Sequence, residues 1–212
     1  MAVNDKIVMA EDEINTDIPD LLSFVEKYAP SKLPTNWHHE LYYDILQNKV
    51  TMGADGKLVL NTTDKINKNI LMLAPRFHAK SQSITINYPL WEMYRNPNVR
   101  ILIVSANEEI AVSFNRAIMN HLENNHELIE AHGSLVPQFQ NKKKWGEKAI
   151  IIKRNTFEKD PTVAAIGLGG RLISRRADII ICDDLIDIET ARTKQQRTKT
   201  IERKVQLLID FT

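Results

Sequence analysis

The sequence is short of several features that would assign it to a special class of protein. It has one cysteine, Cys182, so no disulfide can form within the chain, and a reducing, intracellular setting is expected. No apolar run approaches the roughly 18–20 residues that a membrane helix needs. The first residues show no basic segment followed by an apolar one, so nothing predicts secretion. These absences argue against secreted, disulfide-bonded and membrane-spanning proteins.

The composition is that of an ordinary soluble globular protein. Hydrophobic residues make up 43% and charged residues 26% of the 212 residues, which excludes wholesale disorder and suits one domain with a real core. The net charge of +1 points to no partner of either sign. The charge is nevertheless uneven: residues 1–30 are acidic, whereas residues 171–204 are rich in lysine and arginine. A basic region of this kind can bind phosphate groups.

Apolar strands alternating with helices predict an α/β sandwich with a mostly parallel central sheet. A polar, acidic lead-in with a short helix is expected over 1–35, and the main domain over 36–212. Glycine-containing residues 51–68 predict a hairpin or loop. Strands are expected at 69–74, 99–105, 149–153, 163–167 and 178–182, and helices at 17–29, 37–48, 80–94, 108–124 and from about 189 onward.

A candidate phosphate-binding loop follows the first expected strand. The residues Ala74-Pro-Arg-Phe-His-Ala-Lys-Ser81 lead from that strand into a helix, as in the pattern G-x-x-x-x-G-K-[ST]. The helix N-terminus would favour an anion, Lys80 would neutralise phosphate, and the Ser81 hydroxyl would bind Mg²⁺. Both glycines of the pattern are alanine here, Ala74 and Ala79. A lone Lys-Ser pair after a strand is usually just a helix start, so the interpretation needs a second motif.

Two adjacent carboxylates provide that second motif. The apolar run Ile179-Ile-Ile-Cys182, in which Cys182 is expected to pack in the core, ends in Asp183 and Asp184. Ligands of open α/β sheets bind at the carboxyl ends of the strands. Asp183 could there orient Mg²⁺ and Asp184 could polarise an attacking water. A charged turn after a core strand explains the acid pair alone about as well as a functional site does, but the pair together with Lys80-Ser81 favours a nucleotide site.

These segments together resemble the N-terminal ATPase domain of the large terminase subunit of tailed bacteriophages, the DNA-packaging motor. The resemblance rests on the loop 74–81, on Val99-Arg-Ile-Leu-Ile-Val-Ser-Ala-Asn107, and on the run from Gly169 to Ile186. The segment Trp37-His-His-Glu40 resembles the part that helps to hold adenine in such motors. The likeness covers about residues 34–212. It implies a P-loop NTPase fold of the ASCE/RecA-like type, a three-layer sandwich, with the nuclease domain beyond this chain.

The resemblance also implies roles for individual residues. ATP would be bound by the loop and by neighbouring side chains, and Mg²⁺ by Ser81 and Asp183. Asp184 would be the catalytic acid, with Asp187 and Glu189 as alternative bases, and Arg76 would stabilise charge on the γ-phosphate. The residues expected to contact nucleotide are Ala74, Pro75, Arg76, Phe77, His78, Ala79, Lys80, Ser81, Gln82, Trp37 and His38.

Other interpretations of these residues stay open. Trp37 is slightly more typical of a core plug than of an adenine contact. Arg171, Arg175 and Arg176 could reach a neighbouring subunit's γ-phosphate or the DNA, or could form ordinary ion pairs. The family implies double-stranded DNA, a portal protein, a small terminase subunit and a homo-oligomeric ring as partners, in the host cell cytoplasm and without a membrane. The alternatives are a helicase-like ATPase, or a degenerate P-loop domain that only acts as a scaffold.

Overall fold

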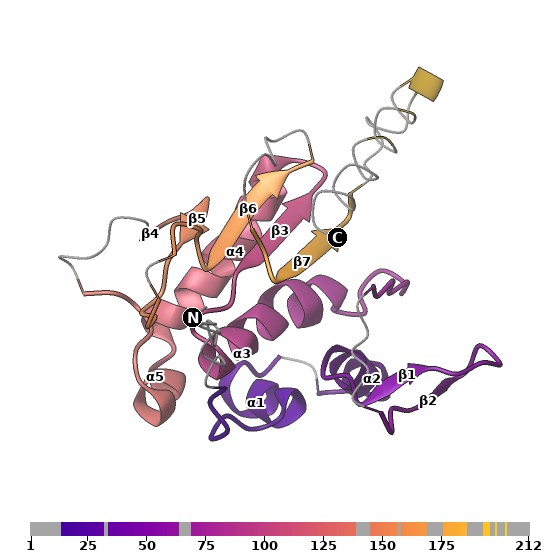
Figure 1. Cartoon of the computed structure of the whole chain (residues 1–212), viewed down its shortest axis with the longest axis horizontal. Helices are drawn as coiled ribbons and strands as arrows, with labels where there is room; N and C mark the ends of the chain where they lie inside the picture. Colours follow the sequence, from indigo (N-terminus) through magenta and orange to yellow (C-terminus); the bar gives the residue numbers. More distant parts are fainter. Residues whose placement is uncertain are drawn as a thin grey trace, which may run out of the picture.

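The computed structural model in Figure 1 describes residues 14–31, 34–63, 69–138, 145–156, 158–168 and 176–185, with 193–195, 198 and 202. In chain order its elements are α1 (Leu21–Tyr28), α2 (Trp37–Leu46), β1 (Val50–Met52), β2 (Leu58–Leu60), the π-helix η1 (Ser81–Asn87), α3 (Tyr88–Arg95), β3 (Ile101–Ser105), α4 (Glu108–Asn124), α5 (His126–His132), β4 (Trp145–Gly146), β5 (Ala149–Ile150), β6 (Val163–Gly167) and β7 (Ile179–Asp183). The α/β class is confirmed.

The main sheet has five strands in the order β4-β5-β6-β3-β7. Strand β3 is parallel to both β6 and β7, whereas β4, β5 and β6 pair in an antiparallel manner. The sheet is therefore mixed, and the expectation of a mostly parallel sheet was wrong. The cause is that the chain reverses twice at this edge of the sheet, at the tight turn Glu147–Lys148 between β4 and β5 and again in the connection between β5 and β6.

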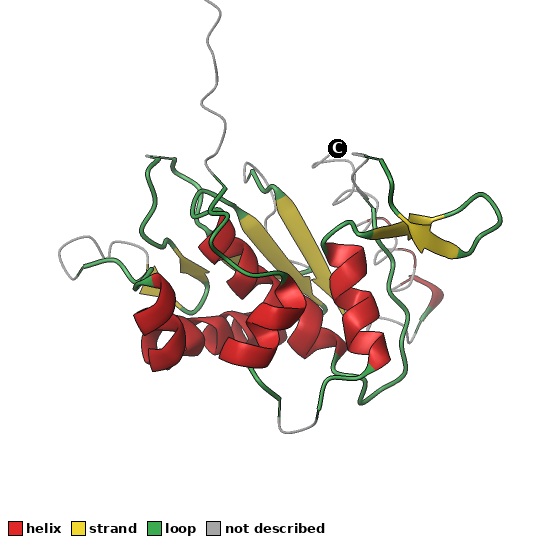
Figure 2. Cartoon of the chain, turned by 90° about the horizontal axis from the view of Figure 1, so that it is seen from below, coloured by secondary structure: helices red, strands yellow, loops and turns green. Residues whose placement is uncertain are grey.

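The main core lies between one face of the sheet and the helices (Figure 2). It takes Ile101 and Ile103 from the central strand, and Phe24, Leu90 and Ile118 from helices α1, α3 and α4. The opposite face carries a second, smaller cluster around Leu102, Val104 and Ile166. The described helices thus form one layer. The expected helix from about residue 189 falls mostly outside the described residues, so the three-layer sandwich stays a prediction.

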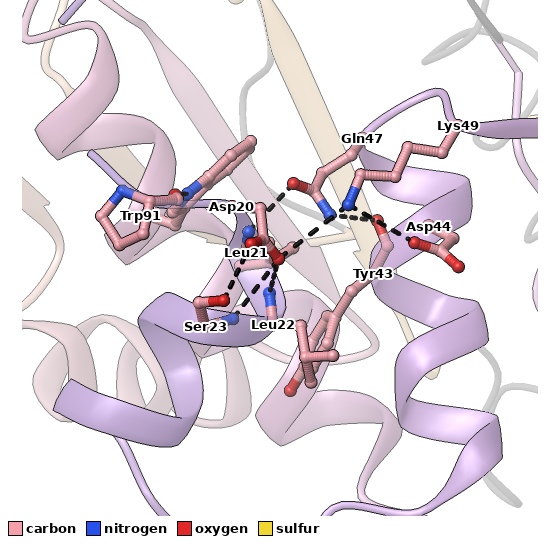
Figure 3. A network of polar contacts seen from close by, with 10 residues as sticks. Asp20, Leu21, Leu22, Ser23, Tyr43, Asp44, Gln47, Lys49 and Trp91 are labelled. Atoms are coloured by element: carbon pink, nitrogen blue, oxygen red, sulfur yellow. Dashed lines mark hydrogen bonds and ion pairs between the residues drawn. The ribbon is translucent and has the colours of Figure 1, made fainter. Parts of the chain in front are cut away.

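Helix α1 begins later than expected. The expected helix starts at residue 17, but the N-cap is Asp20, whose carboxylate accepts hydrogen bonds from the amides of Leu22 and Ser23. Figure 3 shows how this end is tied to its neighbours: the Gln47 side chain accepts from the Leu21 amide at 2.9 Å, and the Trp91 indole donates to the carbonyl of residue 19 at 2.8 Å. Helix α1 is therefore fixed to α2 and α3.

Helix α2 and the following hairpin agree with the expectation. Asn36 caps α2, and the His39 ring accepts from the Asn36 amide at 3.1 Å, which completes a capping box. Strands β1 and β2 form the antiparallel hairpin, which projects from the end of α2 (Figure 1). The hairpin places little in the core, since all three residues of β2 are exposed.

Two expectations about apolar segments were wrong. Residues 69–74 form no strand, and Leu71 and Leu73 are 83% and 86% exposed. The run is apolar enough for a buried strand, but no described strand pairs with it, and a strand exists only through its ladder. Cys182 is exposed instead of packed, because it lies on the outer side of a strand with one described neighbour.

The register of β7 on β3 is held at the amino ends of the two strands. The Arg100 guanidinium donates to both carboxylate oxygens of Asp178, at 3.0 and 2.5 Å, and their backbones are also bonded. Burial alone would raise the pKa of Asp178, but the hydrogen bonds and charge of Arg100 outweigh it and lower the pKa.

Along the described part of the chain, no helix has the length and apolarity to cross a bilayer.

Gly167 is needed where β6 meets the start of α4. A Cβ at this position would lie 2.7 Å from the Glu108 amide nitrogen and 3.0 Å from the Asn107 carbonyl carbon. We expect Gly167→Ala to destabilise the protein by about 1–3 kcal/mol, since backbone cannot yield as a flexible side chain can. Thermal unfolding measures this, and Gly146→Ala is the matched control because nothing lies within 4 Å of its Cβ. Equal midpoints for the two variants would contradict the close approach.

Candidate functional site

The helix after the loop begins where the sequence places it. From Lys80 to Arg95 the backbone is helical without a break, and its first turn is closed by the Ser83 amide, which donates to the Ala79 carbonyl at 2.9 Å. Residues Ser81–Asn87 of this run form the π-helix η1, an uncommon geometry that is frequent at functional sites. Lys80 and Ser81 thus lie at the N-terminus of a long helical run, which favours an anion.

A hydrogen bond joins this helix to the carboxylate pair. The Thr85 hydroxyl, which is buried, donates to Oδ2 of Asp183 at 3.2 Å. Thr85 lies about one helical turn after Ser81, so the bond brings the end of the loop next to the carboxyl end of β7. The two motifs, about one hundred residues apart in sequence, therefore lie close together in the structure.

Buried polar side chains also tie η1 to α2. The Tyr43 hydroxyl donates to Ser83 Oγ at 3.3 Å, and the Asn87 side chain donates to the Tyr43 hydroxyl at 3.4 Å. Gln82, a predicted nucleotide contact, donates its amide to Asn87 at 2.9 Å. Because buried polar groups are costly unless they are bonded, this network determines how α2 and η1 pack.

The loop itself has an unusual backbone. Phe77 and Ala79 adopt positive φ angles of 66° and 49°, in the left-handed region that glycine tolerates best. Ala79 stands where the phosphate-loop pattern has its second glycine. The Lys80 ammonium donates to the Ala74 carbonyl at 3.1 Å and so closes the loop. Pro75, Arg76 and Phe77 are exposed, and the Phe77 side chain is fully so.

Imidazole rings lie where α2 meets the loop. The rings of His38 and His78 are 5.0 Å apart, and His38 is 4.0 Å from His39. Burial lowers the pKa of His39, and the neighbouring charges of His38 and His78 lower it further. Trp37 is 70% exposed, so its interpretation as a core plug was wrong. The structure places His38 beside His78 of the loop, and its predicted contact with nucleotide stays a prediction.

The remaining predicted residues are placed as follows. Asp184 is exposed and has a φ of 42°, a left-handed conformation that Asp tolerates better than most residues. Such strain is often found at functional sites. Arg176 is exposed. Arg171, Arg175 and the alternative bases Asp187 and Glu189 lie outside the described residues.

The donor set suits Mg²⁺ bound together with a phosphate ligand. Mg²⁺ is usually held by one or two carboxylates, with water and substrate phosphates completing the octahedron. Asp183 supplies a carboxylate, and Ser81 a hydroxyl at the helix N-terminus. No group of three or more His, Cys, Asp or Glu side chains is placed to hold a metal within the described ranges. The site therefore fits a metal that arrives with nucleotide better than one held by protein alone.

Sequence reasoning missed Thr85 and Tyr43. Thr85 could have been found, because it lies four residues after Ser81 and so on the same side of a helix. Tyr43 carried no signal, since a tyrosine on an amphipathic helix is ordinary core and its hydroxyl partner is forty residues away. Both act by holding η1 in place rather than by touching a ligand in this structure.

Comparison with known proteins supports the resemblance. The chain is 31% identical over 138 residues to the "Terminase, large subunit" of Enterobacteria phage T3. The chain is therefore similar to one phage large terminase subunit. The match covers 63% of this chain but only 22% of that protein, so the chain spans about a fifth of this relative's length. No model of a known protein family matches the chain.

The left-handed backbone at Ala79 makes a testable difference between the two loop alanines. A non-glycine residue in this region is strained by about 1–2 kcal/mol, so Ala79→Gly is expected to leave the unfolding free energy unchanged or to raise it by about 1 kcal/mol. Ala74, whose φ is not positive, is the matched control: Ala74→Gly is expected to lose about 0.5–1 kcal/mol. Chemical denaturation measures both. An equal loss in the two variants would contradict the strained geometry.

Proposed function

We propose that this chain carries the nucleotide site of a Mg²⁺-dependent ATPase that drives viral double-stranded DNA into a procapsid. The observation that carries the proposal is the 3.2 Å hydrogen bond from Thr85 to Asp183, which unites the Lys80–Ser81 helix start with the carboxylates of β7. The relationship to the large terminase subunit of phage T3 supports the packaging role. ATP hydrolysis is the expected energy source.

The residues of the site would divide the work of phosphoryl transfer. Lys80 would leave the Ala74 carbonyl to neutralise the β- and γ-phosphates, and the amides at the start of η1 would bind their oxygens. Ser81 and Asp183 would hold the metal, directly or through water. Bound Mg²⁺ would neutralise charge that develops on the phosphates. Asp184 would orient the attacking water and accept its proton.

Further charges and partners follow from the family. Arg76, exposed in the loop, is the candidate for stabilising the γ-phosphate in the transition state. Arg171, Arg175 and Arg176 are candidates for acting on a neighbouring subunit or on DNA. The assembled motor would be a homo-oligomeric ring that meets a portal protein and a small terminase subunit in the host cytoplasm. Head-to-tail contacts that supply an arginine in trans close into such rings.

Two observations favour a second candidate, a scaffold that does not hydrolyse nucleotide. Lys80 is bonded inside its own loop, and Ala79 holds a conformation that costs an alanine free energy. Both would oppose tight phosphate binding.

A helicase-like ATPase would differ from a packaging motor by unwinding duplex DNA, which a strand-separation assay detects.

Nucleotide binding is tested first. We expect Mg²⁺–ADP or Mg²⁺–ATP to raise the thermal unfolding midpoint of the chain, because ligand binds only the folded state. At one hundred times the dissociation constant the gain is about 2.7 kcal/mol, or roughly 5–10 °C for a chain of this size. In Lys80→Ala this shift is expected to vanish. Lys57→Ala is the control, since Lys57 lies on the hairpin and pairs with Asp55 at the surface.

The two candidate functions give different results in this experiment. A midpoint shift in wild type that persists in the Lys57 variant and disappears in the Lys80 variant supports the ATPase. No shift at millimolar nucleotide in wild type supports the scaffold and contradicts the nucleotide site.

Asp184 is tested separately from binding. Asn tolerates the left-handed region as well as Asp does, so Asp184→Asn is expected to keep the fold and the nucleotide-induced midpoint shift. ATP turnover, measured as phosphate release with DNA present, is expected to fall about 10²- to 10⁴-fold because the general base is lost. A variant that hydrolyses ATP at the wild-type rate would show that the base is another residue, with Asp187 and Glu189 the next to test.

A further inference from the structure

The hydroxyl of Ser105 is an anomaly in the core. Ser105 is 0% exposed, and its Oγ has no hydrogen-bond partner in the part of the chain that the structure describes. Most buried side-chain hydroxyls are bonded, because an unpaired one gives up its bonds to water without replacement. A serine that keeps such a group at a carboxyl end of the sheet calls for an explanation.

The position of Ser105 supplies one. Ser105 is the last residue of β3, and in the parallel register it is directly opposite Asp183 on β7. Residues opposite each other in a parallel pair present their side chains on the same face of the sheet. That face is the one on which Ile101, Ile103 and Ile181 contact the helices, and it is where η1 lies. Ser105 and Thr85 therefore approach Asp183 from two elements, β3 and η1.

The Asp183 carboxylate has room for a second donor. Thr85 bonds one of its oxygens, Oδ2, and the structure records no bond on Oδ1 within the described residues. A carboxylate that binds Mg²⁺ must point one oxygen at the metal, and its orientation is set by donors on its remaining lone pairs. A single hydrogen bond from Thr85 leaves the Asp183 carboxylate able to rotate about its Cβ–Cγ bond.

We infer that Ser105 is a positioning residue whose hydroxyl donates to Asp183 when a divalent cation is bound at the carboxyl edge of the sheet. The inference deepens the proposed function and rests on the metal site assigned there. Among the described residues the hydroxyl has no partner; once the carboxylate turns toward the cation, Ser105 and Thr85 would hold it from two sides. Ser105 touches neither the nucleotide nor the cation.

The variant Ser105→Ala distinguishes this role from a structural one, because the two roles predict different changes in the ligand-free unfolding midpoint and in the affinity for Mg²⁺–ADP. Without ligand, removing an unpaired buried hydroxyl is expected to leave the thermal midpoint unchanged or to raise it by about 2–4 °C. With Mg²⁺–ADP, the midpoint shift is expected to be smaller than in wild type, with an affinity about 10-fold weaker. Ser105→Cys, similar in size and a weak donor, is expected to recover part of that affinity.

Thr162→Val is the matched control. Thr162 is equally buried, but it precedes β6 at the opposite end of the sheet, and its hydroxyl accepts from the Ile152 amide at 3.3 Å. Its loss is expected to lower the ligand-free midpoint and to leave the affinity for Mg²⁺–ADP unchanged. Each protein is measured with ADP in EDTA, with Mn²⁺ alone by electron paramagnetic resonance, and with Mg²⁺–ADP.

The outcomes distinguish this inference from the proposed function. Equal cation-dependent affinity in wild type and Ser105→Ala overturns the role of Ser105 and leaves the nucleotide site intact. A large drop in the ligand-free midpoint of Ser105→Ala also overturns it, since the hydroxyl would then have a structural partner. Mn²⁺ binding that depends on Ser105 without any response to ADP supports the positioning role and contradicts the nucleotide site. No response of wild type to cation or nucleotide overturns both.

Discussion

The parallel register of β6, β3 and β7 is the constraint on which the candidate site depends. Because the three strands are aligned residue by residue, Gly167, Ser105 and Asp183 end at the same level of the sheet. The register is held from the other end, where Arg100 and Asp178 bond through both side chains and backbones. The Arg100–Asp178 ion pair, at the amino ends of the strands, thus helps to fix the position of the carboxylates at their carboxyl ends. A slip of one residue would turn Asp183 to the other face of the sheet.

Contacts among the helices fix the loop relative to the sheet. Helix α4 can start close to the sheet because Gly167 has no Cβ, and it covers the same face as η1. Helix α1 fixes α2 through Gln47, and α2 fixes η1 through Tyr43. The start of η1 is therefore held both by helix α2 and by Asp183 on the sheet. This arrangement gives Lys80 and Ser81 a rigid support on their C-terminal side.

Sequence patterns predicted well the helices and strands that form because of residues within or next to the element itself. Strand β3 is a fully buried apolar run, and α4 begins one residue after the capping Asn107, as its sequence indicates. The meeting of the loop with the carboxylates was also predictable, because both motifs adjoin ordered elements of an α/β pattern. The resemblance to large terminase subunits was also stated from sequence motifs, and the chain is similar to the large terminase subunit of phage T3.

What sequence could not predict depends on contacts between distant residues. Residues 69–74 have strand composition but no described partner strand, and β5 turns antiparallel because a two-residue turn reverses the chain before it. Thr85 and Ser105 are inconspicuous in sequence, since their meaning comes only from their places beside Asp183. Composition records how apolar a segment is, whereas pairing and register are properties of the assembled sheet.

The loop is thus held more firmly at its C-terminal end than at its N-terminal end. This difference determines which end of the loop would move in the proposed binding of phosphate. On the C-terminal side, η1 is held by the buried hydrogen bond that Tyr43 donates to Ser83 and by the part-buried one that Thr85 donates to Asp183. On the N-terminal side, Leu71 and Leu73 are exposed, and the contact that closes the loop is the bond from Lys80 to the Ala74 carbonyl. A phosphate that takes over the Lys80 ammonium would release that end of the loop without disturbing η1. The free-energy cost of opening would then fall on the part-buried hydrogen bond from Lys80 to Ala74 and on the backbone of Ala79, rather than on the core.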